Sequence, residues 1–340
     1  NMNAPFSHNG GARLLTDAQA LSLIQDQSFK INQTVYETRF PDWDFGRLVY
    51  VDTSGPAWSP GILTYTSDLS GRANWQSAYA KDIPLADVSQ DMQTKTFQLA
   101  AIGYQYNIEE VNTAYQVGSS LPDRRARAAR LAYTKFMYDI TLFGSAEKGL
   151  GGITNYAGVT TSIVPADGTG NATYWVNSAG VGLKTPAQIV RDINIALQGI
   201  ALASFETEMA DTILLPVEAL NYIAATPYSA TTMETILSFV QRTNIYTLTT
   251  GRPLTIRSVR ELGAAGVGAA AGTGRMVAYK NDQDYVKLHL PMPHQFLPVY
   301  QDGPLNWTIP GIFRTGGVEV LTTVAFRYLD GISQPPAAGS

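Results

Sequence analysis

The sequence predicts an α+β fold with an extended hairpin, one long helix and an α/β block. Three observations predict it. Residues 56–84 read as a two-stranded hairpin, and residues 121–143 can form one uninterrupted helix. Residues 185–309 alternate between helical and strand patterns. A two-stranded hairpin alone is marginally stable in water, so it is expected to rest on another surface.

The composition has little charge and many apolar side chains. Of the 340 residues, 45% are hydrophobic and 15% are charged, against about 25% charged in typical domains. Such surface is often buried against partners. The net charge of −4 argues against sequence-specific nucleic-acid binding. The lack of cysteine excludes disulfides and thiolate sites. No apolar run is long enough for a transmembrane helix, so no membrane partner is expected.

Residues 1–55 are predicted to form an N-terminal arm. Its opening is rich in Gly and Asn without a period, and a short helix is expected over 17–27. Aromatic residues and Pro41 follow. Aromatic side chains on an irregular segment indicate that it lies across a surface.

The hairpin is expected to have strands over 62–66 and 73–80 with a turn over 67–72. Trp75 and Tyr79 fall on one face of the second strand because its side chains alternate. We predict that these two rings form a docking face, with Arg72 of the turn in the same interface.

Residues 92–108 are predicted to form a long strand before the helix over 121–143. Pro122 near the start of the helix and Gly144 after its end are typical of helix termini. At 1.5 Å per residue the helix is about 35 Å long and can act as a spine. One apolar stripe is expected on Ala126, Ala129, Tyr133, Phe136, Ile140 and Phe143.

The α/β block begins with a helix after Thr185, whose apolar face carries Ile189, Ile193, Ala196 and Ile200. The pattern Thr231-x-x-Glu234 predicts a capping box that opens a later helix. Further elements are expected as a strand over 212–215, a helix ending near 225, and strands over 254–259, 275–280 and 284–290.

The clearest alternation in the chain covers residues 317–329, which are predicted to form one strand. Its expected partner is the strand over 92–108, so that the end of the chain closes a sheet beside the spine helix.

Candidate catalytic patterns are weak. His8, His289 and His294 are expected at the surface or in an interface, and Glu109 and Glu110 would point to opposite faces of a strand. The glycine-rich stretch 266–271 lacks the following helix that a dinucleotide loop needs. No catalytic, metal or cofactor-binding residue is therefore predicted, and the chain is expected not to be an enzyme.

Four arginines, Arg124, Arg125, Arg127 and Arg130, crowd the first turns of the spine helix. Cations are unfavourable at the positive end of a helix dipole, so an anionic partner is expected. Three interpretations stay open: a solvated face with local ion pairs, salt bridges between subunits, and contact with packaged nucleic acid. We include the four arginines in the candidate assembly interface.

The order of these parts carries a family resemblance over residues 20–332. Five stretches carry it: 78–84, 103–110, 124–144, 149–155 and 317–329. In this order they resemble the major capsid proteins of tailed bacteriophages, which have the Hong Kong 97-type fold.

The resemblance implies five segments. They are an N-terminal arm over 1–55, an extended loop over 56–84 that lies on a neighbouring subunit, a peripheral domain over 85–184 and 310–332, an axial domain over 185–309, and a C-terminal tail over 333–340. It also implies self-assembly through pentamers and hexamers into an icosahedral phage head, which forms in the host cytoplasm. This head is expected to enclose double-stranded DNA and to contact it non-specifically. Implied partners are portal and scaffolding proteins, with decoration proteins as a further possibility. The alternatives are a nanocompartment shell of the same fold and, from another class, a soluble carboxylate-dependent hydrolase.

Overall fold

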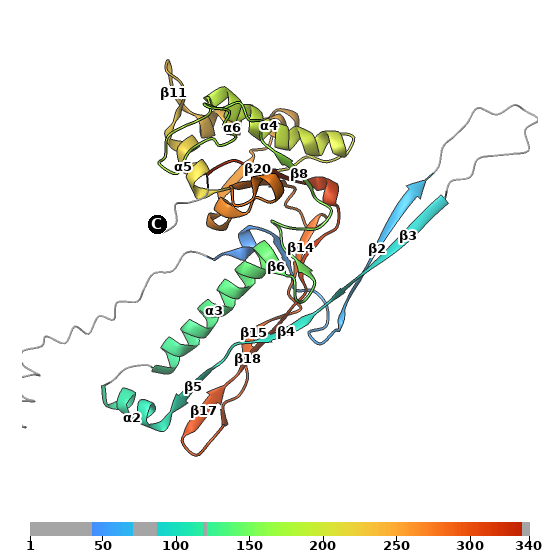
Figure 1. The fold of residues 1–340 in the computed structure, drawn as a ribbon. Helices are drawn as coiled ribbons and strands as arrows, with labels where there is room; N and C mark the ends of the chain where they lie inside the picture. Colours follow the sequence, from blue (N-terminus) through green and yellow to red (C-terminus); the bar gives the residue numbers. More distant parts are fainter. Residues whose placement is uncertain (1–42, 71–86, 118–120, 335–340) are drawn as a thin grey trace, which may run out of the picture. The chain divides into compact units, whose positions relative to one another are not determined.

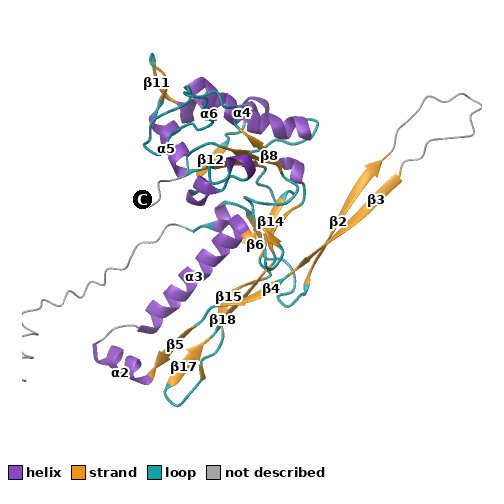
Figure 2. Cartoon of the chain, in the orientation of Figure 1, coloured by secondary structure: helices purple, strands orange, loops and turns teal. Residues whose placement is uncertain are grey.

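A computed structural model describes residues 43–70, 87–117 and 121–334 (Figures 1 and 2). The predicted helix over 17–27 and the predicted strand over 73–80 lie outside these residues.

A five-stranded mixed sheet occupies the centre of the α/β part, in the order β12-β9-β13-β20-β8. Four helices belong to this part, and Ile189, Ile193, Ala196 and Ile200 of α4 are all buried, which confirms their predicted face. The bounds are β8 Thr160–Ile163, β9 Thr212–Leu215, β12 Thr255–Ser258, β13 Arg275–Tyr279, β20 Phe326–Asp330, α4 Pro186–Ala203, α5 Val217–Ala225, α6 Ile236–Thr243 and α7 Ile245–Thr250.

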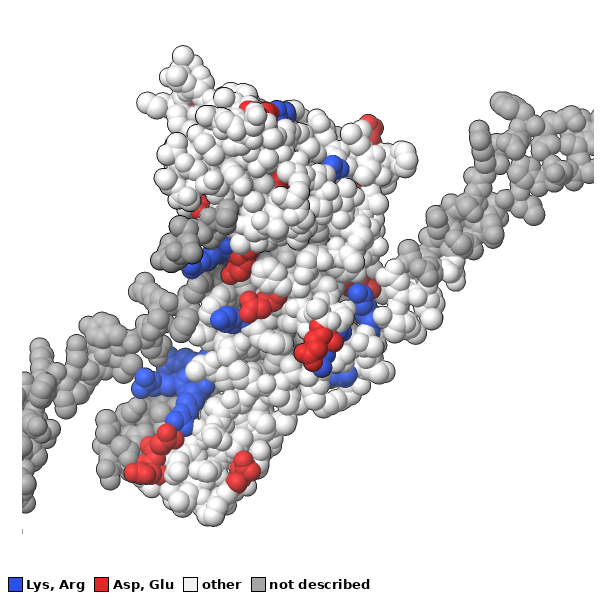
Figure 3. Space-filling model, viewed as in Figure 1, with Lys and Arg blue, Asp and Glu red and all other residues white. Residues whose placement is uncertain are grey.

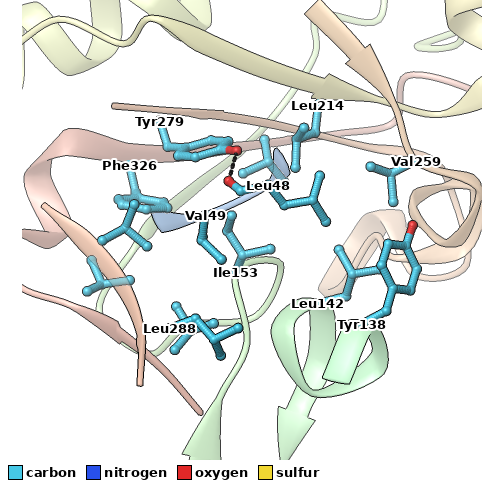
Figure 4. Close-up of a cluster of buried hydrophobic side chains, with 14 of the residues drawn as sticks. Leu48, Val49, Tyr138, Leu142, Ile153, Leu214, Val259, Tyr279, Leu288 and Phe326 are labelled. Atoms are coloured by element: carbon cyan, nitrogen blue, oxygen red, sulfur yellow. Dashed lines mark hydrogen bonds between the residues drawn. The ribbon is translucent and has the colours of Figure 1, made fainter. Parts of the chain in front are cut away.

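Side chains alternate across this sheet into two hydrophobic cores. On β9, Leu214 belongs to one core, while Ile213 and Leu215 belong to the other. The first core also takes in the spine helix and a second sheet, and Tyr279 donates a hydrogen bond to the backbone oxygen of Leu48 within it (Figure 4). The second core is formed with the helices of the α/β part. One sheet therefore supports both cores.

The spine helix is α3, Leu121–Phe143, over the predicted range. Its buried side chains differ from the predicted stripe, because Met137 is fully buried while Phe136 is 42% exposed. The second sheet has the order β1-β14-β19, with bounds Tyr50–Asp52, Val286–His289 and Gly317–Val320.

Two further three-stranded sheets have the orders β15-β18-β4 and β16-β17-β5. Their bounds are β15 Met292–Phe296, β18 Gly311–Thr315, β4 Gln98–Ala101, β16 Tyr300–Gln301, β17 Asn306–Ile309 and β5 Tyr104–Asn107. The remaining elements are η1 Phe45–Arg47, α2 Ile108–Val117, β6 Gly144–Ser145, β7 Leu150–Gly151, β10 Pro227–Ser229, β11 Thr232–Thr235, η2 Arg260–Ala264, η3 Gly268–Ala270 and η4 Thr323–Ala325.

The hairpin strands are β2, Gly61–Ser70, and β3, Asp87–Thr96, which pair antiparallel from Gly61↔Thr96 to Ser70↔Asp87 (Figure 1). We call this pair the ribbon. The predicted turn over 67–72 is wrong in its first part, because residues 67–70 continue the strand. Residues 87–96 supply the paired strand, so the ribbon reaches beyond the predicted boundary at 84.

The predicted single strand over 317–329 is wrong. Gly317 has a φ of +67°, β19 ends at Val320, and η4 separates it from β20. The two strands then join different sheets: β19 pairs with β14, and β20 pairs with β13 and β8. Neither pairs with residues 92–108, whose partners are β2, β18 and β17.

The predicted strand over 92–108 is divided into three pieces, β3, β4 and β5. Gly103 lies in the second interruption, where an added Cβ would come within 2.3 Å of the backbone oxygen of Ile309. The chain can therefore pass this close to its neighbour only without a side chain.

Glu109 and Glu110 lie in the first turn of α2 and not on a strand. The Asn107 side chain accepts from the Glu109 N–H at 3.1 Å, and Glu110 accepts from the Asn107 N–H at 3.2 Å. These reciprocal bonds start the helix. The capping box predicted at Thr231 is wrong, because residues 232–235 form β11 and Thr235 caps α6.

Candidate assembly interface

The ribbon has two different faces because its side chains alternate. Leu63 and Tyr65 lie on one face, and Met92 is the cross-strand partner of Tyr65. The exposed fractions of these three side chains are 51%, 66% and 55%. We call Leu63, Tyr65 and Met92 the outer face. Contiguous apolar side chains this exposed are typical of an interaction surface.

The opposite face of the ribbon is bound to the rest of the chain. Thr64 donates to Glu319 Oε1 at 3.1 Å, and the Lys95 ammonium lies 3.4 Å from the Tyr156 hydroxyl and 5.4 Å from the centre of its ring. Arg314 donates to the backbone oxygen of Ala57 at 2.9 Å, just before the ribbon. These contacts fix the base of the ribbon, while the three side chains of the outer face are each more than half exposed.

A buried ionic group lies beneath this attachment. His289 Nε2 is 2.7 Å from Glu319 Oε2, and His289 Nδ1 is 3.6 Å from Asp52 Oδ2. The expectation that His289 lies at the surface is wrong, because only 3% of it is exposed. His294 is half-buried and lies with its ring stacked on Tyr133.

The two carboxylates of this group keep their charge readily. Burial raises the pKa of Glu319, but hydrogen bonds from His289 and Thr64 and the charge of His289 outweigh it and leave the pKa below its ordinary value. Burial likewise raises the pKa of Asp52, and hydrogen bonds from Ser54 with the charges of His289 and Lys287 bring it below the ordinary value. Thr64 therefore attaches the ribbon to an ionised side chain.

The predicted arginine cluster separates into two kinds of residue. Arg125 donates to Glu110 Oε1 at 2.9 Å and also to the backbone oxygen of Gln105. The hydrogen bond from Arg125 lowers the pKa of Glu110 below its ordinary value. A local acid thus supplies the anionic partner for Arg125, as one of the three interpretations expects.

The other three arginines, Arg124, Arg127 and Arg130, are exposed on α3. Arg130 lies over the ring of Phe296 at 5.7 Å. The predicted interface residues Arg72, Trp75 and Tyr79 lie outside the described residues.

Sequence reasoning missed the outer face. The sequence predicts a strand over 62–66, but Met92 falls in the separately predicted strand over 92–108. Pairing of β2 with β3 is a long-range contact that no local pattern encodes.

Across the described parts of the chain, no helix is long and apolar enough to span a membrane. The same residues contain no cluster of three or more His, Asp or Glu side chains suited to a metal ion.

Comparison with known proteins decides the family. A model of major capsid proteins matches residues 71–332, most of the chain. The chain belongs to the major capsid protein family. The predicted resemblance is therefore confirmed. No curated protein matches the sequence significantly.

Solved capsid structures share the fold of this capsid protein at low identity. The capsid of Myoviridae phage XM1 has a TM-score of 0.74 at 15% identity, covering 95% of this chain and all of that one. A Microbacterium phage Oxtober96 chain has a TM-score of 0.60 at 11% identity, covering 93% of this chain and 98% of that one. The capsid of a native GTA particle has a TM-score of 0.57 at 10% identity, covering 98% of this chain and all of that one.

The family establishes a structural role. The chain is a major capsid protein of a phage or phage-like particle, located in the virion and assembling with copies of itself. Because this role is structural and not enzymatic, the hydrolase alternative is not favoured. The nanocompartment alternative is not favoured either, because the matching family model is that of major capsid proteins.

Proposed function

We propose that this capsid protein forms an icosahedral head that encloses double-stranded DNA, through the Hong Kong 97-type arrangement. In this proposal the N-terminal arm and the ribbon reach a neighbouring subunit. Residues 85–184 and 310–332 form the peripheral domain around α3, and residues 185–309 form the axial domain. The sheet that contains β9, β13, β20 and β8 then joins the two domains.

The observation that carries the proposal is the outer face of the ribbon. It is apolar and exposed, while the opposite face is attached to the chain's own sheet through Thr64 and Lys95. A fixed base with an exposed apolar face is suited to docking on another copy. Such a contact is weak for one pair, but a closed shell repeats it around every subunit.

The proposal includes pentamers and hexamers as assembly units. The matched GTA capsid was computed with C5 symmetry, and five-fold symmetry in a related shell is compatible with pentamers. Portal and scaffolding proteins are proposed partners, with decoration proteins as optional ones, and assembly is proposed to take place in the host cytoplasm. Arg72, Trp75 and Tyr79 are proposed to extend the docking surface.

The test is the double variant Leu63→Ser/Tyr65→Ser in the full chain. Losing two apolar side chains from each contact should weaken it by about 2–4 kcal/mol. We expect a soluble, folded subunit that forms few closed particles by sedimentation velocity and negative-stain microscopy. Purified wild-type particles are expected to contain nuclease-resistant double-stranded DNA.

The matched control is Gln93→Ala, which changes the same ribbon on the opposite face. It should assemble as the wild type does, while circular dichroism shows that both variants are folded. Normal yields of equally heat-resistant particles from Leu63→Ser/Tyr65→Ser would exclude the outer face as a docking surface.

A further inference from the structure

One hairpin projects from the α/β part and carries a fully exposed apolar side chain. It is formed by β10 and β11, in which Pro227 pairs with Thr235 and Ser229 with Thr232. Figure 1 shows it at the β11 label, standing out from the helices around it. Met233 on β11 is fully exposed. This side chain therefore adds no apolar burial to its own subunit.

The projecting hairpin is fixed in place by α6. The rings of Tyr228 and Phe239 stack with their centres 3.9 Å apart and their planes at 8°. Arg242 of α6 donates to Glu234 at 2.8 Å, and Glu234 is the only charged residue within 227–235. Figure 3 shows that the visible surface of the α/β part is mostly uncharged. A fixed projection whose charge is already paired loses little conformational entropy when it docks.

A hollow of about 490 Å³ lies elsewhere on the α/β part, beside α4 and α7. Its apolar wall includes Leu202 of α4, Met209 of the following segment and Ile245 of α7. Leu202 is also exposed, so apolar surface continues out of the hollow. The volume is typical of a pocket that receives a ligand group.

The turn after α4 holds an aromatic side chain outward beside this hollow. Phe205 has a φ of +52°, and Glu206, which lines the hollow, has a φ of +64°. Glycine is the usual residue just after a helix in this left-handed conformation, because a Cβ makes it unfavourable. Phe205 is nevertheless 93% exposed and gains little burial in its own subunit. Backbone strain of this kind is typical of functional segments.

The hairpin and the hollow lie toward opposite ends of α4. Gly182, just before α4, lies so close to Tyr222 of α5 that an added Cβ would come within 1.9 Å of the Tyr222 hydroxyl. The helix α5 leads into β10, so the hairpin is near the start of α4. The hollow instead involves the last residues of α4, which has 18 residues and is about 27 Å long. Met233 therefore does not occupy the hollow of its own copy.

We propose that Met233 of one copy docks in the hollow of the next copy around a ring of subunits. The inference deepens the proposed function and rests on it, because it names a contact inside the proposed pentamers and hexamers. A projection and a hollow at different places on one chain form a head-to-tail contact. Such contacts close into a ring when the rotation between copies permits it.

A second copy is the occupant that the observations favour. The chain assembles with copies of itself, and it supplies both the projection and the hollow. Docking would bury apolar surface of Leu202, Phe205 and Met233 that a single subunit leaves exposed.

The experiment uses the lack of cysteine in the native chain. Full-length Met233→Cys/Leu202→Cys is assembled into particles, treated with a short bismaleimide cross-linker and separated by denaturing electrophoresis. We expect multimers up to pentamers and hexamers, because each subunit is linked once on each side. Either single-cysteine variant has one thiol per subunit and can give at most dimers.

The matched control is Met233→Cys/Val181→Cys, which places the second thiol at another exposed apolar position, close before α4. It should give no multimers beyond dimers. Normal particles in which Met233→Cys/Leu202→Cys gives no multimers would overturn the contact, leave the hollow to a different occupant and keep the proposed shell intact. Dimers alone would also overturn it, since they indicate a symmetric pair and not a ring. A wild type that forms no particles would reject the proposed function together with this contact.

Met233→Glu tests the same contact without cysteine. The side chain is exposed in the isolated subunit, so circular dichroism should show a normally folded variant. Docking would place the new carboxylate in an apolar hollow beside Glu206. We expect the yield of closed particles to fall by roughly tenfold or more in sedimentation velocity, because an unpaired charge is buried. Val181→Glu is the control and should assemble as the wild type does. A wild-type yield from Met233→Glu would contradict the docking of Met233.

Discussion

At the scale of single residues, the group formed by His289, Glu319 and Asp52 connects the ribbon to the folded core. Each comes from a different strand of the sheet β1-β14-β19. Asp52 lies opposite His289 in the parallel pair, and Thr64 of the ribbon donates to Glu319. The side chain that accepts from the ribbon is thus held by a buried histidine. We expect the attachment of the ribbon to depend on the charge of Glu319.

Glu319→Gln tests that dependence. The pKa of Glu319 is lower in the folded chain than its ordinary value of 4.5, so folding favours the carboxylate. Its contribution to stability is therefore present above about pH 4.5 and is lost as the pH falls through the lower folded-state value. The variant should lose about 1.5–3 kcal/mol at pH 7, because a buried hydrogen bond to a charged group is lost.

The measurement is urea unfolding of unassembled subunits at pH 7 and at several acidic values. The loss caused by Glu319→Gln should shrink as the wild-type carboxylate becomes protonated. Glu147→Gln is the control, since Glu147 is paired with Lys148 in an exposed position and should change little. An equal loss at every pH would show that the charge of Glu319 contributes nothing.

At the scale of elements, the length of α3 was predictable and its buried face was not. Pro122, Gly144 and the apolar content between them indicate where the helix begins and ends. Apolar residues occur on several sides of the helix, and only tertiary packing decides which are covered. Met137 is buried in the first core, while Phe136 is partly exposed.

Substitutions at the neighbouring positions 136 and 137 test which face of α3 is buried. Met137→Ala should destabilise the subunit by about 2–5 kcal/mol, because it leaves a cavity in the core. Phe136→Ala should cost less than half as much, although it removes the larger side chain, since 42% of Phe136 is already exposed. Chemical denaturation of both variants measures the difference. Equal or reversed costs would contradict the assigned buried face.

Strand partners were the least predictable feature of the elements. Alternation indicates that residues 317–329 and 92–108 are extended, but pairing is a long-range property. The helix η4 interrupts the first segment, Gly103 lies in one of the two interruptions of the second, and the resulting pieces join different sheets. The start of α2 had a local signal, since Asn107 and Glu110 have the spacing of a capping box.

The same limit applies to the candidate interface. A local pattern identified the first strand of the ribbon, yet the exposed outer face also needs Met92 from β3. Arg125 was predicted to need an anionic partner, and Glu110 is that partner. The pairing of Arg125 on α3 with Glu110 on α2 depends on how the fold positions the two helices, which the sequence pattern does not indicate.

At the scale of the whole subunit, the central sheet couples both hydrophobic cores. Val277 and Tyr279 of β13 enter the first core, while Met276 and Ala278 enter the second. The ends of β13 and β20 are further joined by the buried bidentate pair of Arg275 and Asp330, at 2.6 and 2.8 Å. Neither core keeps its sheet strands if the other unfolds. The described part of the chain should therefore unfold as one cooperative unit.

Calorimetry of subunits carrying Leu63→Ser/Tyr65→Ser tests this coupling without interference from shell assembly. We expect one transition, with a calorimetric enthalpy close to the van't Hoff enthalpy. Ile193→Ala removes a side chain from the second core and Leu288→Ala removes one from the first. Each should lower the midpoint of the same transition by several degrees, because cavity formation in either core destabilises the shared sheet. Two separate transitions, each moved by only one of the two variants, would contradict the coupling and mean that the cores unfold independently.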